Sequence, residues 1–193
     1  MARIVLASGS PRRQELLTRI GIRDFTVRVP QVEEWYPQGL TPPEIVSYIS
    51  REKSQAVPSE EDEIVITADT MVFLDGKRLG KPRDEADALR MLTALQGRSH
   101  TVCTGVTVRR GSEILTESET TRVYFRPADQ AELLSYIATG EPMDKAGAYG
   151  IQGGAALFCE KLEGDYYNVM GLPVCRLYET LCRTVPEVME DTL

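Results

Sequence analysis

The sequence predicts one α/β domain built around a mixed β-sheet. A hydrophobic run at residues 4–7 is followed at once by an amphipathic helix over residues 11–20, as in a parallel α/β unit. Two pairs of strand-like runs are joined by short turns, at Asp75-Gly76 and at residues 109–112, as in antiparallel hairpins. With 193 residues, 42% of them hydrophobic, the chain is long enough to bury a single core.

The first helix carries clear local signals. Ser10 is placed as its N-cap and Pro11 as its first residue, and Gly21 follows its end. Leu16 and Leu17 contribute to a stripe that is expected to be buried. The strand at residues 4–7 and this helix therefore form the first α/β unit.

The next elements follow from composition and capping. Residues 25–29 predict a second strand, and residues 41–44 form a capping box with proline at the first helical position. The helix that this box opens is expected to run to about residue 57. Residues 64–68 predict a buried strand that ends at Asp69-Thr70.

The rest of the chain mixes helices with antiparallel strands. In chain order we expect a hairpin of residues 71–74 and 77–80, a helix from Asp84 to Gln96, strands over 100–108 and 113–125, a helix over 128–138, glycine-rich loops and short strands over 144–172, and a helix opened by Pro173. The acidic tail, residues 186–193, is expected to be loose.

The composition argues against several classes of protein. The net charge is −7, from 29 acidic and 22 basic residues, whereas proteins that follow a nucleic-acid backbone usually carry a basic face. No stretch reaches the roughly 18 apolar residues of a membrane span, and the short N-terminal run predicts a strand rather than a signal peptide.

The four cysteines form no C-x-x-C pair, which disfavours a zinc site and is typical of free thiols in a reducing cytoplasm. A single histidine, His100, at a strand start favours a structural role, so acid–base chemistry should rest on carboxylates and lysines.

Two arginines stand where helix electrostatics disfavours them. Arg12 and Arg13 fall in the first turn of the helix over residues 11–20, beside the positive end of the macrodipole and its unpaired backbone N–H groups. Such an end binds anions, and two guanidinium groups add charge-assisted hydrogen bonds. A solvated pair of surface arginines is the alternative. The pattern suggests a phosphate-like anion at this turn.

Carboxylates and a lysine extend this candidate site. Asp69 follows a buried strand, and ligands in open α/β sheets bind beyond the carboxyl ends of strands, where a carboxylate can accept a proton from water or hold Mg²⁺. Glu33-Glu34 lies in a loop and either holds a divalent metal or is a surface pair. Lys53 lies at the edge of the apolar face of its helix, where it either reaches into a cleft or covers apolar surface with its stem.

Two glycine-containing segments are further candidates. GKRLGKP, residues 76–82, fails as a phosphate loop because its glycines are one residue too close and Pro82 replaces the Mg²⁺-binding Ser/Thr, although Lys81 remains a candidate phosphate contact. In AGAYGIQGG, residues 146–154, the glycines allow close backbone approach and Gln152 can read a base edge with both a donor and an acceptor. A tight structural turn is the alternative for this segment.

Taken in order, the segments resemble the Maf family of nucleoside triphosphate pyrophosphatases. Those that carry the resemblance are LASGSPRRQELL at 6–17, Glu33, the helix with Lys53, ADT at 68–70, GKP at 80–82, AGAYGIQG at 146–153 and YYNVMGLP at 166–173. The resemblance implies a cytoplasmic enzyme that uses a divalent cation (Mg²⁺, Mn²⁺ or Co²⁺) to cleave between the α and β phosphates, releasing a nucleoside monophosphate and pyrophosphate. It also implies a single elongated α/β domain over residues 1–193, with a central twisted mixed sheet flanked by helices, a nucleotide-binding cleft, and assembly as a homodimer. The expected partner is a nucleoside triphosphate, with neither nucleic acid nor membrane.

The resemblance assigns roles to particular residues. It makes Asp69 the proton acceptor, and it makes Glu33 a carboxylate that helps to place the metal or the water, so both are candidate metal ligands. The phosphate-binding positions that it implies are Ser8, Arg13, Lys53 and Lys81, of which the two lysines also count as catalytic.

Three positions linked to substrate choice indicate a branch of the family. Arg12, Thr70 and Gln152 stand in SPRR, ADT and YGIQG, the pattern of the branch that cuts dTTP and UTP. The resemblance thus implies a dTTP/UTP pyrophosphatase, which could also remove modified pyrimidine nucleotides. The alternatives are a 7-methyl-GTP pyrophosphatase of the same family and, given the family's link to cell-division arrest, a nucleotide-sensing division inhibitor without significant catalysis.

Overall fold

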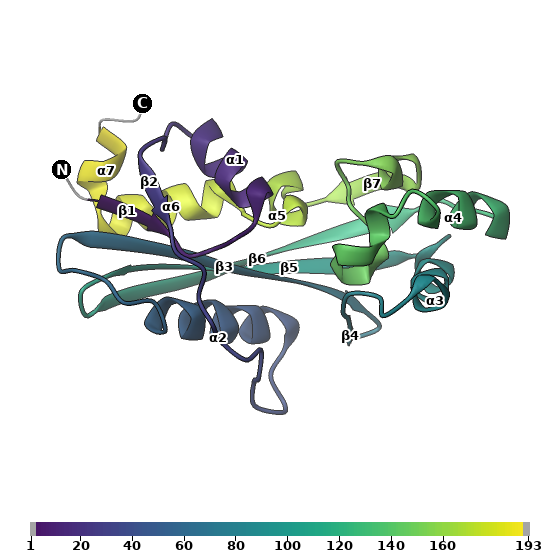
Figure 1. Cartoon of the computed structure of the whole chain (residues 1–193), viewed down its shortest axis with the longest axis horizontal. Coiled ribbons are helices and arrows are strands. Elements are labelled where there is room, and N and C mark those ends of the chain that lie inside the picture. Colours follow the sequence, from purple (N-terminus) through teal and green to yellow (C-terminus); the bar gives the residue numbers. More distant parts are fainter. Residues whose placement is uncertain (1–2, 191–193) are drawn as a thin grey trace. The chain divides into compact units, whose positions relative to one another are not determined.

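A computed structural model describes residues 3–190 of the chain (Figure 1). The strands are β1 (Arg3–Leu6), β2 (Phe25–Val27), β3 (Glu63–Leu74), β4 (Lys77–Leu79), β5 (Ser99–Arg110), β6 (Glu113–Phe125) and β7 (Cys159–Glu163). The α-helices are α1 (Pro11–Arg19), α2 (Pro42–Gln55), α3 (Glu85–Leu95), α4 (Gln130–Ile137), α5 (Tyr166–Met170), α6 (Val174–Thr184) and α7 (Pro186–Glu190). Short 3-10 helices are η1 (Glu141–Asp144), η2 (Ala146–Ala148) and η3 (Gly154–Leu157).

The strands form a seven-stranded mixed sheet, which confirms the predicted fold class. Their order is β2-β1-β3-β5-β6-β7, with β4 paired to β3. β1 pairs in parallel with both β2 and β3, whereas the β3–β4 and β6–β7 pairs are antiparallel. The β3–β4 hairpin turns at Asp75 and Gly76, which have φ angles of 50° and 74°, as the Asp-Gly signal predicts.

The chain forms two compact units, each assembled from separate stretches of sequence. The first unit holds the described residues up to Thr70, together with Thr104–Glu119 and the described residues from Gly171 on; the second holds Met71–Cys103 and Thr120–Met170. β3, β5 and β6 each continue from one unit into the other. In the first unit, α2 lies on one side of the strands, with α1 and α6 on the other (Figure 1).

The first two helices begin as their sequences predict. Ser10 occupies the N-cap position of α1, although its side chain makes no capping hydrogen bond, Pro11 is the first helical residue, and Gly21 follows the helix with a φ of 94°. At α2 the capping box forms, with the backbone N–H of Thr41 donating to the Glu44 carboxylate at 2.7 Å. These local signals are strong enough to define helix starts without tertiary information.

One expectation about β3 is wrong. The predicted strand over 64–68 does not end at Asp69, because β3 continues without a break to Leu74 and is buried along nearly its whole length. Aspartate is a residue type that is depleted in strands. Here Lys53 on α2 pairs with the Asp69 carboxylate, so the strand can continue through this position. β1 does end nearby, since Leu6 pairs with Ile66, and Asp69 therefore lies just beyond the end of a neighbouring strand.

Most of the other differences lie at element ends, but the expectation of only loops and short strands over residues 144–172 is wrong where α5, η2 and η3 form. The second strand stops at Val27 rather than residue 29, and α2 stops at Gln55 rather than 57. The expectation of a loose tail is wrong for Pro186–Glu190, which forms α7, where Glu187 accepts a hydrogen bond from Arg110 at 2.5 Å. Residues 191–193 lie outside the described residues. Within residues 3–190, no helix is both long and apolar enough to cross a membrane.

A buried ion pair at the start of β3 predicts a pH-dependent stability. The Glu63 carboxylate is buried and accepts two hydrogen bonds from Arg28, at 2.6 and 2.7 Å. This pairing lowers the pKa of Glu63 from 4.5 to about 2, so its contribution is complete above pH 4.5 and is lost as the pH falls toward 2. Glu63→Gln is expected to lower the Tm at pH 7, with a difference from the wild type that narrows as the pH falls below 4.5. Thermal melts between pH 7 and pH 3 measure it, and a difference that is constant across this range would contradict the assignment.

Candidate active site

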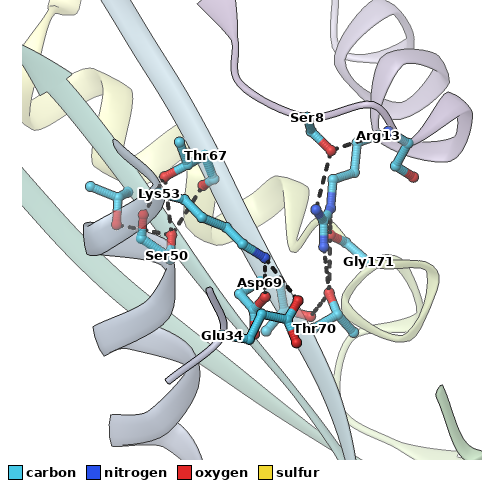
Figure 2. A network of polar contacts seen from close by, with 12 residues as sticks. Ser8, Arg13, Glu34, Ser50, Lys53, Thr67, Asp69, Thr70 and Gly171 are labelled. Atoms are coloured by element: carbon cyan, nitrogen blue, oxygen red, sulfur yellow. Dashed lines mark hydrogen bonds and ion pairs between the residues drawn. The ribbon is translucent and has the colours of Figure 1, made fainter. Parts of the chain in front are cut away.

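Lys53 donates hydrogen bonds to two carboxylates in the first unit (Figure 2). Its Nζ donates to Asp69 Oδ1 at 2.5 Å and to Glu34 Oε1 at 3.4 Å. The Asp69 side chain is 5% exposed and that of Lys53 is 17% exposed, whereas that of Glu34 is 44% exposed. The Lys53–Asp69 ion pair is thus largely shielded from water. Electrostatic interactions are stronger in such a shielded site than in bulk water.

The helix α2 is fixed on the sheet close to this ion pair. The Ser50 hydroxyl, one helical turn before Lys53, donates to Thr107 Oγ1 of β5 at 2.9 Å. The Thr67 hydroxyl of β3, two residues before Asp69, donates to the Ser50 carbonyl at 2.7 Å. Residues two apart on a strand share a face, so the hydroxyl contacts and the ion pair lie on the same side of β3.

Arginine 13 is held at the start of α1 by three oxygen atoms. Its Nε donates to the Gly171 carbonyl at 2.7 Å, its Nη1 to Ser8 Oγ at 3.2 Å and its Nη2 to Thr70 Oγ1 at 3.0 Å (Figure 2). Burial lowers the pKa of Arg13, and the negative charge of Asp69 opposes that shift. A guanidinium has five N–H donors, so these three bonds fix its plane and leave two donors for a further acceptor.

The carboxylate of Asp69 has an oxygen available for chemistry. Oδ1 accepts from Lys53, while Oδ2 is buried and has no hydrogen-bond partner among the described residues. A buried polar atom without a partner is costly, and such atoms point to a water, ion or substrate that completes the site. The arrangement can therefore hold a water molecule or a cation at Asp69, beside the positive charges of Lys53 and Arg13.

The first unit brings together most of the residues that the sequence singled out. Those that share hydrogen bonds in it are Ser8, Arg13, Lys53, Asp69 and Thr70. Arg12 lies on the exposed surface of α1. Glu33 is also exposed, and the neighbouring Glu34 is the residue that contacts Lys53.

The second unit holds the two remaining candidates. Lys81 is exposed after β4, and Gln152 is exposed in the loop that follows η2. The backbone of Gly147 donates to the Gly80 carbonyl at 3.0 Å, so the GKP and AGAYGIQG segments lie against each other.

The histidine has a structural environment, as its position suggested. His100 is 3% exposed, and its Nε2 lies 2.7 Å from the hydroxyl of Tyr149. Burial lowers its pKa to about 4, so the imidazole is neutral at pH 7.

Comparison with known proteins identifies the family. A family model described as "Maf-like protein" matches residues 3–184. The chain belongs to the Maf family. A relative in Symbiobacterium thermophilum, described as "dTTP/UTP pyrophosphatase", is 50% identical over 182 residues, which cover 94% of this chain and 93% of that protein. A relative of the same description in Carboxydothermus hydrogenoformans is 51% identical, over 93% of this chain and 97% of that protein.

Among solved structures, a HAM1 protein from Coxiella burnetii has the same general fold as this Maf chain. Its TM-score is 0.50 at 13% identity, covering 95% of this chain and 100% of that one. At that identity the likeness concerns the fold alone, and it agrees with the mixed α/β sheet described above.

Proposed function

We propose that this Maf protein hydrolyses dTTP and UTP between the α and β phosphates, releasing a nucleoside monophosphate and pyrophosphate. The observation that carries the proposal is the buried Asp69 carboxylate, held through one oxygen by Lys53 and left with its other oxygen unpartnered. The description of relatives about 50% identical over nearly the whole chain supports the substrates.

Proton transfer is the role proposed for Asp69. Its free Oδ2 accepts a proton from the attacking water, while the hydrogen bond from Lys53 to Oδ1 keeps the carboxylate oriented. Since the hydrogen bond from Lys53 already fixes the Asp69 carboxylate, the site needs little reorganisation when the water attacks.

Phosphate binding is the role proposed for the arginine cluster. Arg13 is pre-oriented by Ser8, Thr70 and Gly171, and its two remaining N–H donors suit the paired oxygens of a phosphate. Lys53 adds a second positive charge, and the negative charge of the triphosphate offsets the cost of keeping Arg13 buried and cationic. Lys81 stays a candidate phosphate contact.

A divalent cation fits the acidic side of the site. Glu34 is proposed to act with Asp69, because both carboxylates contact the same lysine, and the neighbouring Glu33 stays a candidate. The described residues contain no cluster of three or more acidic, histidine or cysteine ligands. Mg²⁺-type sites use one or two carboxylates together with substrate phosphates, so Asp69 and Glu34 are sufficient as protein ligands for such a cation. When bound, the cation would neutralise charge on the leaving pyrophosphate.

Release of pyrophosphate from a nucleotide panel tests the proposal. We expect turnover of dTTP and UTP that depends on Mg²⁺ or Mn²⁺, with far less from CTP, GTP and 7-methyl-GTP. A preference for 7-methyl-GTP would support the proposed reaction but contradict the proposed substrates. It would also contradict the roles of Arg12, Thr70 and Gln152 in selecting a pyrimidine. Nucleotide binding without release of pyrophosphate would favour the sensor over the enzyme.

A further inference from the structure

A tight turn in the second unit presents Gln152 to solvent. The backbone N–H of Gly153 donates to the Gly150 carbonyl at 3.1 Å, which closes a β-turn with Ile151 and Gln152 at its centre. Ile151 is 8% exposed, while Gln152 is exposed. One central residue thus anchors the turn in the core and the other projects from it.

Both ends of this turn are tied to one pair of side chains. The Tyr136 hydroxyl accepts a hydrogen bond from the Gly150 N–H at 3.2 Å and donates to Glu141 Oε1 at 3.0 Å. The other carboxylate oxygen, Glu141 Oε2, accepts from the Gly154 N–H at 2.9 Å. A continuous chain of hydrogen bonds therefore runs through Tyr136 and Glu141 from the first residue of the turn to Gly154, the residue that follows it.

The glycines of the segment allow this close approach. A Cβ atom on Gly153 would lie 2.2 Å from Glu141 Oε1, and one on Gly150 would lie 2.7 Å from Cε of Lys145. Both distances are too short for real atoms, so side chains at these positions would push Glu141 and Lys145 away. The glycines on either side of Gln152 thus leave room for Glu141 and Lys145 to lie against the turn.

The tyrosine is suited to its double role as donor and acceptor. Tyr136 is 5% exposed, and burial raises the pKa of its hydroxyl, which therefore keeps its proton at neutral pH. A protonated hydroxyl can accept from Gly150 and donate to Glu141 at the same time. Phenylalanine fills the same space and removes both bonds.

We propose that Tyr136 and Glu141 are positioning residues that hold the Gln152 amide in place to read the pyrimidine base. The inference rests on the proposed function, in which Gln152 takes part in substrate choice. An amide can distinguish O4 and N3–H of uracil or thymine from the 4-amino group of cytosine only if its donor and acceptor are presented in a fixed orientation. Bonds on both sides of Gln152 fix the backbone from which its side chain projects, which limits the orientations that the amide must sample when the nucleotide binds.

Tyr136→Phe tests this role. We expect kcat/KM for UTP to fall about three- to tenfold, mainly through KM, which is the size expected for the loss of ordinary hydrogen bonds. We expect kcat/KM for CTP to change much less, so that the preference for UTP over CTP falls. A purely structural defect would lower both values alike. Tyr124→Phe is the matched control, because Tyr124 also donates to a glutamate of the second unit, Glu163 at 2.8 Å, away from the turn.

A double-mutant cycle shows whether Tyr136 acts through Gln152. In a Gln152→Ala background, Tyr136→Phe is expected to have little further effect on kcat/KM for UTP, because the group that it positions is gone. Glu141→Gln replaces one of the two carboxylate oxygens that accept from Tyr136 and Gly154, and it provides a second variant if Tyr136→Phe has a lowered Tm. The same loss of preference is expected from it.

The failures of the two proposals are distinguishable. If the wild-type protein does not hydrolyse dTTP or UTP, the proposed function fails first. If the wild type prefers UTP to CTP, and both Tyr136→Phe and Glu141→Gln keep that preference, the positioning role alone is overturned. Additive effects of Tyr136→Phe and Gln152→Ala would overturn it as well.

Discussion

Asp69→Asn is expected to lower kcat for dTTP by about 10²- to 10⁴-fold, the usual size of a general-base contribution. Asparagine has the shape of aspartate and still offers an oxygen to Lys53 Nζ, which lies 2.5 Å from Asp69 Oδ1. An amide cannot accept a proton at neutral pH, however, so the water would lose its base. Initial rates of pyrophosphate release at saturating dTTP measure the effect, and a thermal melt checks that the variant is folded.

The matched control for this experiment is Asp62→Asn. Asp62 lies immediately before β3 and is half-exposed, where its carboxylate accepts two hydrogen bonds from Arg3 at 2.7 and 2.9 Å. Removing the charge there is expected to leave turnover of dTTP unchanged, since exposed ion pairs contribute little. If Asp69→Asn turned over dTTP at the wild-type rate, Asp69 would not be the proton acceptor, and the proposed mechanism would fall with it.

The parts of the fold that the sequence predicts well are those with local causes. The capping box at Thr41 and the Asp75-Gly76 turn are decided by a few adjacent residues, and both form as expected. β3 differs because the charged Asp69 follows its predicted apolar run, and the partner of that charge comes from another element, α2. The continuation of that strand therefore depends on tertiary contacts that no local pattern contains.

The candidate site shows the same contrast between features with local causes and features that depend on tertiary contacts. The chemistry of the anion site could be inferred from two arginines at a helix start, but consecutive helical residues point about 100° apart, and only the packed structure selects Arg13 over Arg12. In the same way, Glu33 and Glu34 are alike in type and differ only in where the loop directs them, and it is Glu34 that contacts Lys53. The pairing of Tyr136 with Glu141 gave no sequence signal beyond the glycines that accommodate it.

The position of α2 on the sheet depends on a glycine that the sequence analysis did not single out. A Cβ atom on Gly105 of β5 would lie 2.2 Å from the backbone oxygen of Val46 and 2.7 Å from the backbone nitrogen of Ser47. Both are backbone atoms of α2, so no side-chain rotation can relieve the contact. Lys53 lies two turns further along this helix, and the helix position therefore sets the Lys53–Asp69 distance.

Gly105→Ala is accordingly expected to reduce both stability and activity. Overpacking of this kind costs about 3 kcal/mol, which in a chain of this size lowers the Tm by roughly 6–12 °C. We expect kcat for dTTP to fall as well, even at temperatures where the variant is fully folded, because α2 must move away from β5 and carries Lys53 with it. Thermal melts and dTTP turnover at 20 °C measure the two effects.

Gly80→Ala is the control for the thermal melt, because a Cβ atom there would meet nothing within 4 Å and Gly80 does not have a positive φ. Its Tm is expected to stay within about 2 °C of the wild type, the shift of a neutral surface substitution. A Gly105→Ala protein with the wild-type Tm and turnover would mean that α2 does not rest on β5 at this point. A lowered Tm with wild-type turnover would mean instead that the Lys53–Asp69 pair tolerates movement of the helix. A lower Tm together with lower turnover is the expected result. It would show that the geometry of Asp69 and Lys53 depends on the backbone contact between Gly105 and α2, about two helical turns away from Lys53.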